Sequence, residues 1–326
     1  MAILKVLVGP KVDLDTCGTL LCAVLGTYPR PLIMDLQIEV CRTGHASEAD
    51  LADPSVLCIE VGGSGRVEEG NFDHHEAGGP TASATLQALA FYEHALGVIL
   101  QSVEGDEEYD RNIAVDLHIN LGDLIKLVMY IDQLDTEGPQ SFGARKEGFY
   151  LSDLFSGMLL TERDPAKQVR NGFVLLLESL ERGWDPFEPL DDERFDEDLH
   201  PEWVRWLKAK VENNRLLAET IERASWGETG SGRRLAWLES NFFGAPGALY
   251  GHGAEIAVVF NPRFGNPPVW KFTVAGNSVV VTPALERLNA LESGWGGPAT
   301  GTILGSPREG SSLTLEQVVE VVRETL

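Results

Sequence analysis

An aspartate and two adjacent histidines stand together in the first third of the chain, at Asp73, His74 and His75. They follow Phe72, and the whole sequence holds only seven histidines. Imidazole and carboxylate groups together suit divalent transition metals such as manganese, iron or zinc. A second interpretation stays open, in which Asp73 caps a helix and the histidines are polar residues of a turn.

Two aspartates near the N-terminus, Asp13 and Asp15, follow an apolar run at 3–9. Side chains two residues apart share one face of an extended backbone, so both carboxylates can reach one metal ion. Helix capping by Asp15 or Thr16 is the alternative. Capping leaves Asp13 unexplained, and a metal site therefore remains a hypothesis.

A second pair of carboxylates, Asp132 and Asp135, lies at the end of a helical pattern over 111–134. Residues three apart share one face of a helix. Carboxylates at the C-terminal end of a helix interact unfavourably with the helix dipole, which indicates a functional role for the pair. A solvated helix end is the alternative, and the pattern does not decide which of the two aspartates is a ligand.

The elements that must position these residues alternate between strands and helices. Apolar runs predict strands at 3–9, 38–42 and 56–61 and a further strand that ends at Phe72. Helical patterns lie at 15–25, 81–96, 149–160 and 164–182. Such α/β folds place active sites at the carboxyl ends of their parallel strands. The amides that begin the 81–96 helix are a candidate phosphate site, with a simple turn at 78–80 as the alternative.

The second half of the chain has a different composition. Acidic residues and prolines concentrate between 185 and 202, which is typical of a linker. A helical pattern follows at 202–225, then strands at 234–239, 255–260, 269–274 and 278–282, and helices at 284–292 and 315–324. The length suits two domains. The predicted organisation is a metal-binding domain at 1–185, an acidic linker with a connecting helix at 186–228, and a substrate-binding domain at 229–326.

Glycine-rich segments near the C-terminus, 294–301 and 305–312, suit close approach of the backbone to a phosphate. Ser306 and Arg308 lie within the second of them and could bind a phosphate oxygen. A set of tight turns between strand and helix is the alternative.

The charge balance limits the kind of partner. The chain has 26 Lys plus Arg against 50 Asp plus Glu, a formal net charge of −24. Such a protein repels nucleic-acid backbones, so we expect no extended nucleic-acid surface, whereas a small phosphate-bearing substrate or a short oligonucleotide is compatible with it. No apolar run approaches the ~20 residues that span a bilayer, so no membrane contact is expected. The four cysteines predict buried thiols in a reducing cytoplasm. Homo-oligomerisation stays open.

The order of these features resembles the DHH phosphoesterase superfamily. The shared features are an Asp-x-Asp, a carboxylate at a strand end, an Asp-His-His, a later aspartate at a helix end and a C-terminal glycine-rich segment. Within it, Glu60-Val-Gly-Gly, Phe72-Asp-His-His-Glu and Ile131-Asp-Gln-Leu-Asp resemble the melanocyte-proliferating-gene branch most, as do Gly294-Trp-Gly-Gly and Gly305-Ser-Pro-Arg. The resemblance spans essentially the whole chain.

The resemblance implies a doubly wound parallel sheet joined by a linking helix to a smaller mixed α/β domain. It implies one or two Mn²⁺ or other divalent ions, with ligands Asp13, Asp15, Glu60, His74 and Asp135. By the same resemblance, His75 and Asp73 are catalytic: the first would donate to the phosphoryl oxygen or leaving group, and the second would orient a histidine. Substrate contacts would come from Gly296, Gly297, Ser306 and Arg308.

Three positions depart from the superfamily pattern. Gly9-Pro10-Lys11 stands where a histidine commonly precedes Asp-x-Asp, Glu60 replaces the usual bridging aspartate, and Pro298 replaces the histidine of a Gly-Gly-His. The first change can empty one metal position, and the last weakens substrate capture. An enzyme therefore remains the prediction, with its activity depending on these changes.

The predicted function is a divalent-metal-dependent phosphohydrolase or phosphodiesterase that acts on a nucleotide, a short oligonucleotide or another small phosphoester. A metal-activated water would attack the phosphorus. The alternative is a non-catalytic nucleotide- or phosphate-binding protein on the same fold. A third hypothesis is an interaction protein that docks partners through its acidic linker.

Overall fold

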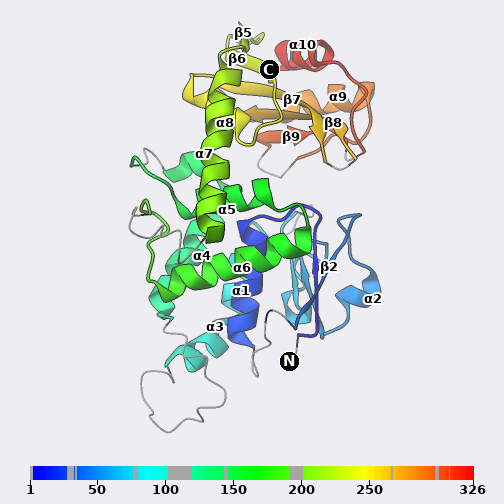
Figure 1. Cartoon of the computed structure of the whole chain (residues 1–326). Coiled ribbons are helices and arrows are strands. Elements are labelled where there is room, and N and C mark those ends of the chain that lie inside the picture. The colour runs from blue at the N-terminus through cyan, green and yellow to red at the C-terminus, as the bar shows by residue number, and fades with distance from the viewer. Residues whose placement is uncertain are drawn as a thin grey trace. The chain divides into compact units, whose positions relative to one another are not determined.

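The computed structural model divides the chain into two compact units, 1–210 and 211–326 (Figure 1). The boundary falls inside helix α7 (Pro201–Ile221). The expected domain limits at 185 and 228 stay predictions. The structure describes residues 3–27, 33, 35–75, 80–101, 119–142, 146–190, 201–265, 267–297, 301–307 and 309–326.

The first unit is built on a four-stranded sheet in the order β2-β1-β3-β4, with every pairing parallel. Its strands are β1 (Lys5–Val8), β2 (Gln37–Val40), β3 (Val56–Ile59) and β4 (Asn71–Phe72). Val8 pairs with Ile59, which pairs with Phe72. These three strands therefore end at one rim of the sheet, and the residues that follow them are brought together.

Helices cover the sheet of the first unit. The larger core includes α1 (Leu14–Gly26), α3 (Ala84–Gln101), α4 (Leu121–Thr136), α5 (Leu151–Thr161) and α6 (Pro165–Glu181). The short helix α2 (Glu48–Leu51) packs through Leu51 against the other face, at Leu7 and Cys58. The α/β class expected from the sequence is confirmed.

Helix α1 is the centre of this helical layer. All of its residues are buried, and it packs against α3, α4 and α6. Most of its residues are apolar, which suits such a position, and the polar ones lie in its first two turns. Gly18 allows the close approach, since a Cβ there would lie 2.6 Å from Thr85 Oγ1 of α3 and 2.8 Å from Ile131 Cδ1 of α4.

The second unit holds a mixed five-stranded sheet in the order β5-β6-β7-β8-β9. The pair β6–β7 is parallel and the other pairs are antiparallel. The strands are β5 (Ser225–Glu228), β6 (Arg234–Glu239), β7 (Ile256–Phe264), β8 (Val269–Gly276) and β9 (Ile303–Gly305). Its helices α8 (Ala245–Gly251), α9 (Leu285–Leu291) and α10 (Leu315–Thr325) contribute to two separate cores.

The strand expected at 278–282 is wrong. Ser278 has the left-handed φ of 56°, which interrupts an extended strand, and a 3₁₀ helix occupies Thr282–Ala284 with a proline near its start. Two short strands, β5 and β9, were not expected, because neither carries the apolar alternation that marks a strand.

Helix α7 contributes to both units. Trp203 and Trp206 in its first half belong to the core of the first unit, whereas Leu217 and Ile221 belong to a core of the second.

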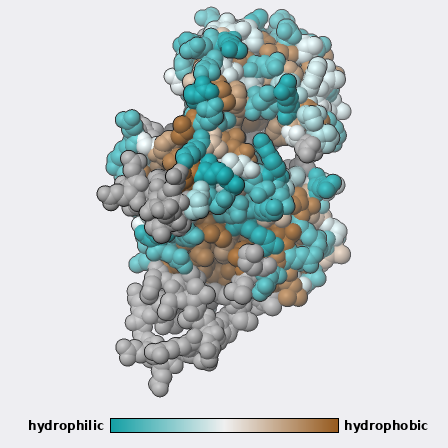
Figure 2. Space-filling view, in the orientation of Figure 1, coloured by the Kyte–Doolittle hydropathy of each residue, from teal (hydrophilic) through white to brown (hydrophobic). Residues whose placement is uncertain are grey.

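Hydrophilic residues are spread over the face of the molecule drawn in Figure 2, in keeping with the acidic composition. Within the described residues, no helix has the length and apolar character needed to cross a membrane.

We expect Gly18→Ala to destabilise the first unit by roughly 1–3 kcal/mol, the usual cost of an overpacked core. The neighbouring Thr85 hydroxyl cannot move away freely, because it donates to Asp15 O at 2.8 Å. Chemical denaturation measures the change. Gly247→Ala is the matched control, since no atom lies within 4 Å of the added Cβ in helix α8. Equal effects of the two substitutions would contradict the packing described for α1.

Candidate metal centre

The first rim segment leads from β1 into α1. Asp13 is the N-cap of α1, and its Oδ1 accepts the Thr16 amide at 2.9 Å. Asp15 follows in the first turn and is 1% exposed. The capping expected from Asp15 or Thr16 is therefore wrong, because Asp13 is the cap, and the buried Asp15 carboxylate must be explained by its surroundings.

The second rim segment begins at Glu60, directly after β3. Its backbone has the left-handed φ of 54°, which costs a residue with a side chain about 1–2 kcal/mol. The Glu60 amide donates to Phe72 O at 2.9 Å, which fixes the strand end. Strain of this kind persists where the surrounding structure enforces it, and it concentrates at functional sites.

The third rim segment follows β4, and Asp73 ties it to the second. Asp73 is 3% exposed. Its Oδ2 accepts the Gly62 amide at 2.7 Å, and its Oδ1 accepts the Ser64 hydroxyl at 3.1 Å and the His75 amide at 2.7 Å. Asp73 thus joins the loop after β3 to the loop after β4. It also fixes the backbone of the histidine pair through the His75 amide.

Three acidic side chains from separate elements surround His74. Its Nε2 lies 3.2 Å from Asp135 Oδ2, 3.6 Å from Glu60 Oε1 and 4.0 Å from Asp15 Oδ2. Asp135 comes from α4, distant in sequence. The four side chains are largely buried, with exposures of 13% for His74, 21% for Asp135, 6% for Glu60 and 0% for Asp15.

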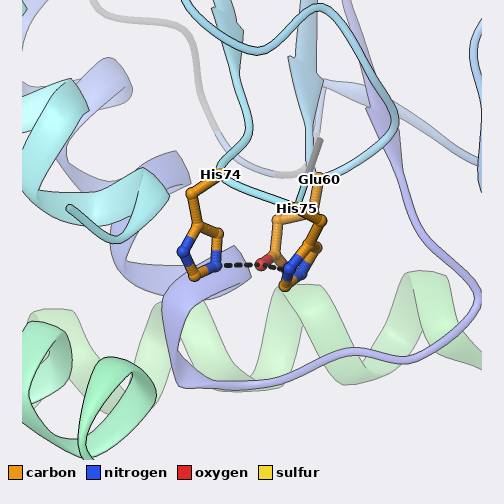
Figure 3. A group of neighbouring side chains, drawn as sticks. All are labelled: Glu60, His74 and His75. Carbon is orange, nitrogen blue, oxygen red and sulfur yellow. Dashed lines mark ion pairs between the residues drawn. The ribbon is translucent and has the colours of Figure 1, made fainter. Parts of the chain in front are cut away.

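His75 is the outer member of the cluster. Its Nε2 lies 3.1 Å from Glu60 Oε1, and its side chain is 54% exposed. Figure 3 shows both imidazole rings turned toward the Glu60 carboxylate. The centroids of the two rings are 4.3 Å apart. Glu60 therefore has a buried histidine and an exposed histidine as neighbours.

The inner atoms of this cluster fit a metal ion. Glu60 Oε1, His74 Nε2 and Asp135 Oδ2 are buried and have no hydrogen-bond partner within the described residues. Two groups of ligand atoms lie within 4.8 Å of one another, namely Glu60, His74 and His75, and Asp15, His74 and Asp135. Ligands that bind an ion at about 2.1 Å lie roughly 3 Å apart, so small movements complete either group.

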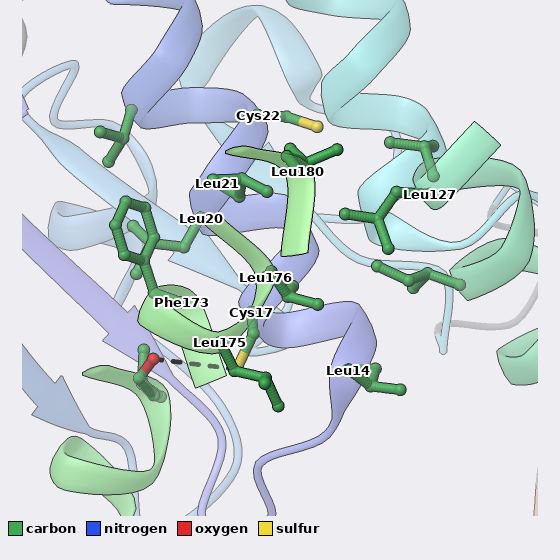
Figure 4. Packing of buried hydrophobic residues seen from close by; sticks show 14 of the residues in the cluster. Leu14, Cys17, Leu20, Leu21, Cys22, Leu127, Phe173, Leu175, Leu176 and Leu180 are labelled. Atoms are coloured by element: carbon green, nitrogen blue, oxygen red, sulfur yellow. Dashed lines mark hydrogen bonds between the residues drawn. The ribbon is translucent and has the colours of Figure 1, made fainter. Parts of the chain in front are cut away.

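Helix packing fixes Asp15 and separates the roles of Asp132 and Asp135. Figure 4 shows apolar residues that pack against α1. The Asp15 oxygens accept the Ala84 and Thr85 amides, each at 2.8 Å, and Asp132 Oδ1 accepts the Ser83 amide at 2.8 Å. The phosphate site expected at the start of the 81–96 helix is therefore wrong, because carboxylates already bind these amides.

Crowding of buried carboxylates opposes their ionisation. Burial, with the charges of Glu60 and Asp135, raises the pKa of Asp13 to about 7. Burial and the same two charges raise the pKa of Asp15 well above its ordinary value. Burial raises the pKa of Asp135 too, although His74 opposes the rise. A cation bound among these groups would remove the repulsion that raises them.

The histidines favour the ionised form of the neighbouring Glu60 carboxylate. Burial opposes the ionisation of Glu60, but its contacts with His74 and His75 outweigh burial and hold its pKa at about 2. Burial likewise opposes the charge on His74, yet Glu60 and Asp135 raise its pKa to about 9. Without a metal, the positive charge of a protonated His74 thus partly offsets the negative charge of the carboxylates.

Thr16 is a member of the site that the sequence did not single out as one. Its Oγ1 lies 2.9 Å from Asp13 Oδ1 and 3.0 Å from Glu60 Oε2. Its hydroxyl has a single proton, so Asp13 and Glu60 share one donor. The only signal in the sequence was the common occurrence of threonine near helix starts.

In the second unit, three of the expected substrate residues, Gly296, Gly297 and Ser306, contact neighbouring backbone. Ser306 Oγ accepts the Phe272 amide at 2.9 Å. Gly296 pairs with Gly305 in an antiparallel bridge, and a Cβ at Gly297 would lie 1.9 Å from Ile303 O. Arg308 and Pro298 lie outside the described residues. Substrate binding by Gly296, Gly297, Ser306 and Arg308 stays a prediction.

The comparisons with known proteins give a likeness of fold. No protein-family model and no curated protein matches the sequence. A solved structure described as the DHH domain of a member of a family of ribosomal proteins matches with a TM-score of 0.51 and 11% identity. The match covers 98% of this chain and 85% of the other. The chain therefore shares the fold of a solved DHH domain.

We expect the thermal midpoint of the metal-free protein to fall as the pH rises from about 6 to about 9. Asp13 has a folded pKa of about 7 against an ordinary 3.8, so its ionisation destabilises the fold fully only above pH 7. His74 has a folded pKa of about 9 against an ordinary 6.5, so its contribution is complete below pH 6.5 and lost through pH 9. Calorimetry in EDTA measures both.

Added Mn²⁺ should raise the midpoint, and by more at pH 8.5 than at pH 6, because protons compete with metal for the same atoms. Asp135→Asn should remove most of this rise. Asp53→Asn is the matched control, since Asp53 is exposed in the loop before β3. A rise that is independent of pH, or unchanged in Asp135→Asn, would contradict a metal centre at these residues.

Proposed function

We propose that the chain is a divalent-metal-dependent phosphoesterase of DHH type that hydrolyses a nucleotide, a short oligonucleotide or another small phosphoester. The observation that carries the proposal is the convergence of three buried atoms, Glu60 Oε1, His74 Nε2 and Asp135 Oδ2, which have no hydrogen-bond partner among the described residues. The likeness in fold to a solved DHH domain supports it.

The proposed ligands are Asp15, Glu60, His74 and Asp135, with Asp13 beside them at the start of α1. Carboxylate and imidazole donors suit Mn²⁺ and related ions. When bound, such an ion lowers the pKa of a coordinated water and offsets the negative charge of a phosphoryl group. The buried position of these ligands keeps bulk water from competing for them.

His75 is the proposed substrate-contacting residue. Its side chain is half exposed while Nε2 stays 3.1 Å from Glu60 Oε1. The contact with Glu60 raises the pKa of His75 above its ordinary value, which favours the protonated imidazole near neutral pH. A protonated His75 can donate to a phosphoryl oxygen or to the leaving group. Asp73 would act as a positioning residue, through the His75 amide.

The proposed substrate is small, because a net charge of −24 opposes a long polyanion. Further proposals rest on the sequence: the likeness to the melanocyte-proliferating-gene branch, a cytoplasmic location, and phosphate contacts from Gly296, Gly297, Ser306 and Arg308. Whether the chain forms a homo-oligomer stays open.

A non-catalytic phosphate-binding protein is the second candidate. It is favoured by the start of α1, where Asp13 serves as a helix cap and no histidine precedes it. Such a protein would bind nucleotides and release no phosphate or alcohol product. The two candidates therefore differ in turnover rather than in binding.

We expect hydrolysis of bis(p-nitrophenyl) phosphate and of short oligonucleotides in Mn²⁺, and a loss of about 10²–10⁴-fold in kcat for His75→Gln, the range for a general acid. His75→Gln should keep its bound metal, whereas Asp135→Asn should lose both metal and activity. Stopped assays together with metal analysis by mass spectrometry separate these effects.

His94→Gln, on the exposed surface of α3, is the matched control and should behave as the wild type. Loss of activity in His75→Gln and Asp135→Asn, with His94→Gln unchanged, excludes a contaminating phosphatase, whose activity would be indifferent to all three substitutions. No turnover with Mn²⁺, Mg²⁺ or Co²⁺, combined with measurable nucleotide binding, would favour the non-catalytic candidate.

A further inference from the structure

We infer that the centre holds one divalent ion rather than two. The inference rests on the proposed metal centre and concerns how many ions this set of side chains can bind. Its starting observation is that the two groups of ligand atoms overlap in His74. The three contacts of His74 with Asp15, Glu60 and Asp135 all involve Nε2.

One imidazole nitrogen has a single lone pair and therefore binds a single ion. The two ligand groups consequently cannot each hold an ion through His74. If the ion occupies the position shared by His74, Asp135 and Asp15, the other group is left, among the residues that the structure describes, with Glu60 and His75. Two protein ligands are fewer than the three that even an open, catalytic metal site usually has.

The two carboxylate oxygens of Glu60 have different neighbours. Its Oε1 faces both histidines, at 3.6 Å from His74 and 3.1 Å from His75. Its Oε2 points to Thr16 Oγ1 at 3.0 Å instead. A carboxylate that joins two ions commonly presents one oxygen to each. Glu60 presents Oε1 to both histidines and Oε2 to a hydroxyl, and this arrangement favours one ion over a carboxylate that joins two.

The carboxylates of α1 are engaged in a similar way. Asp13 Oδ1 accepts from both the amide and the hydroxyl of Thr16, each at 2.9 Å. Asp15 Oδ1 accepts the Thr85 amide, and Asp15 Oδ2 accepts the Ala84 amide while lying 4.0 Å from His74 Nε2. Asp15 Oδ2 is thus the oxygen that lies near His74, and Asp13 Oδ1 binds the start of the helix.

The end of β1 supplies no further ligand. Gly9 has no side chain, and Lys11 is exposed and interacts electrostatically with Asp13. A lysine ammonium carries positive charge, which opposes a second cation near Asp13. The single-ion set is therefore His74 Nε2, Asp135 Oδ2, Glu60 Oε1 and Asp15 Oδ2.

Gly9 offers a way to test the missing ligand directly. A Cβ built there would meet only Glu60 O, at the ordinary contact distance of 3.5 Å, and the Gly9 backbone is outside the left-handed region. A side chain at position 9 is therefore tolerated beside Glu60. Gly9→His should add an imidazole ligand beside Glu60 and raise the number of bound ions.

The experiment is a Mn²⁺ titration of the full chain, by equilibrium dialysis with metal analysis and by electron paramagnetic resonance. We expect one ion per chain in the wild type, with the six-line spectrum of isolated Mn²⁺, and two per chain in Gly9→His. Gly251→His is the matched control, because nothing lies within 4 Å of its added Cβ at the end of α8. It should stay at one.

Two ions per wild-type chain, with a spin-coupled spectrum, would overturn the single-ion inference and leave the proposed metal centre standing. No bound ion would overturn the proposed function itself. A Gly9→His variant that still binds one ion would show that the missing ligand at position 9 does not limit the number of ions, and would contradict the inference. The ion count does not depend on catalytic activity, so the test is independent of substrate identity.

Discussion

Repulsion among buried carboxylates is the constraint on which the first unit depends. Asp13, Asp15, Glu60 and Asp135 come from three elements and gather at one rim, where desolvation already opposes their charge. The protein compensates with the amides at the start of α3, which bind Asp15, and with His74, which lies against three of the four. A bound divalent cation would complete this compensation more fully than a proton, since it carries twice the charge.

The fold produces this gathering through strand register and helix packing. Parallel pairing places the ends of β1, β3 and β4 at one rim, and the left-handed backbone of Glu60 turns its carboxylate toward the histidines. On α4, Asp132 and Asp135 share a face but differ in task. The first anchors the start of α3, and the second faces His74.

The sequence was sufficient to predict those features of the fold that follow from general rules of strand and helix packing. Carboxyl ends of parallel strands meet, which predicted that residues after β1, β3 and β4 would lie together. It could not predict that Asp15 and Asp132 would bind the amides of α3, or that Thr16 would reach Glu60, because such bonds depend on the packing of distant segments. The strand expected at 278–282 failed through the left-handed Ser278, which residue type alone does not reveal.

The central claim is that a divalent ion binds between His74 and Asp135. Crystals grown with Mn²⁺ and measured at the manganese absorption edge test it most directly. The account predicts an anomalous peak at a bonding distance of about 2.0–2.2 Å from His74 Nε2 and from the carboxylates of Asp135 and Glu60. Density for a fully ordered site without such a peak, or with His74 and Asp135 turned away from each other, would contradict it.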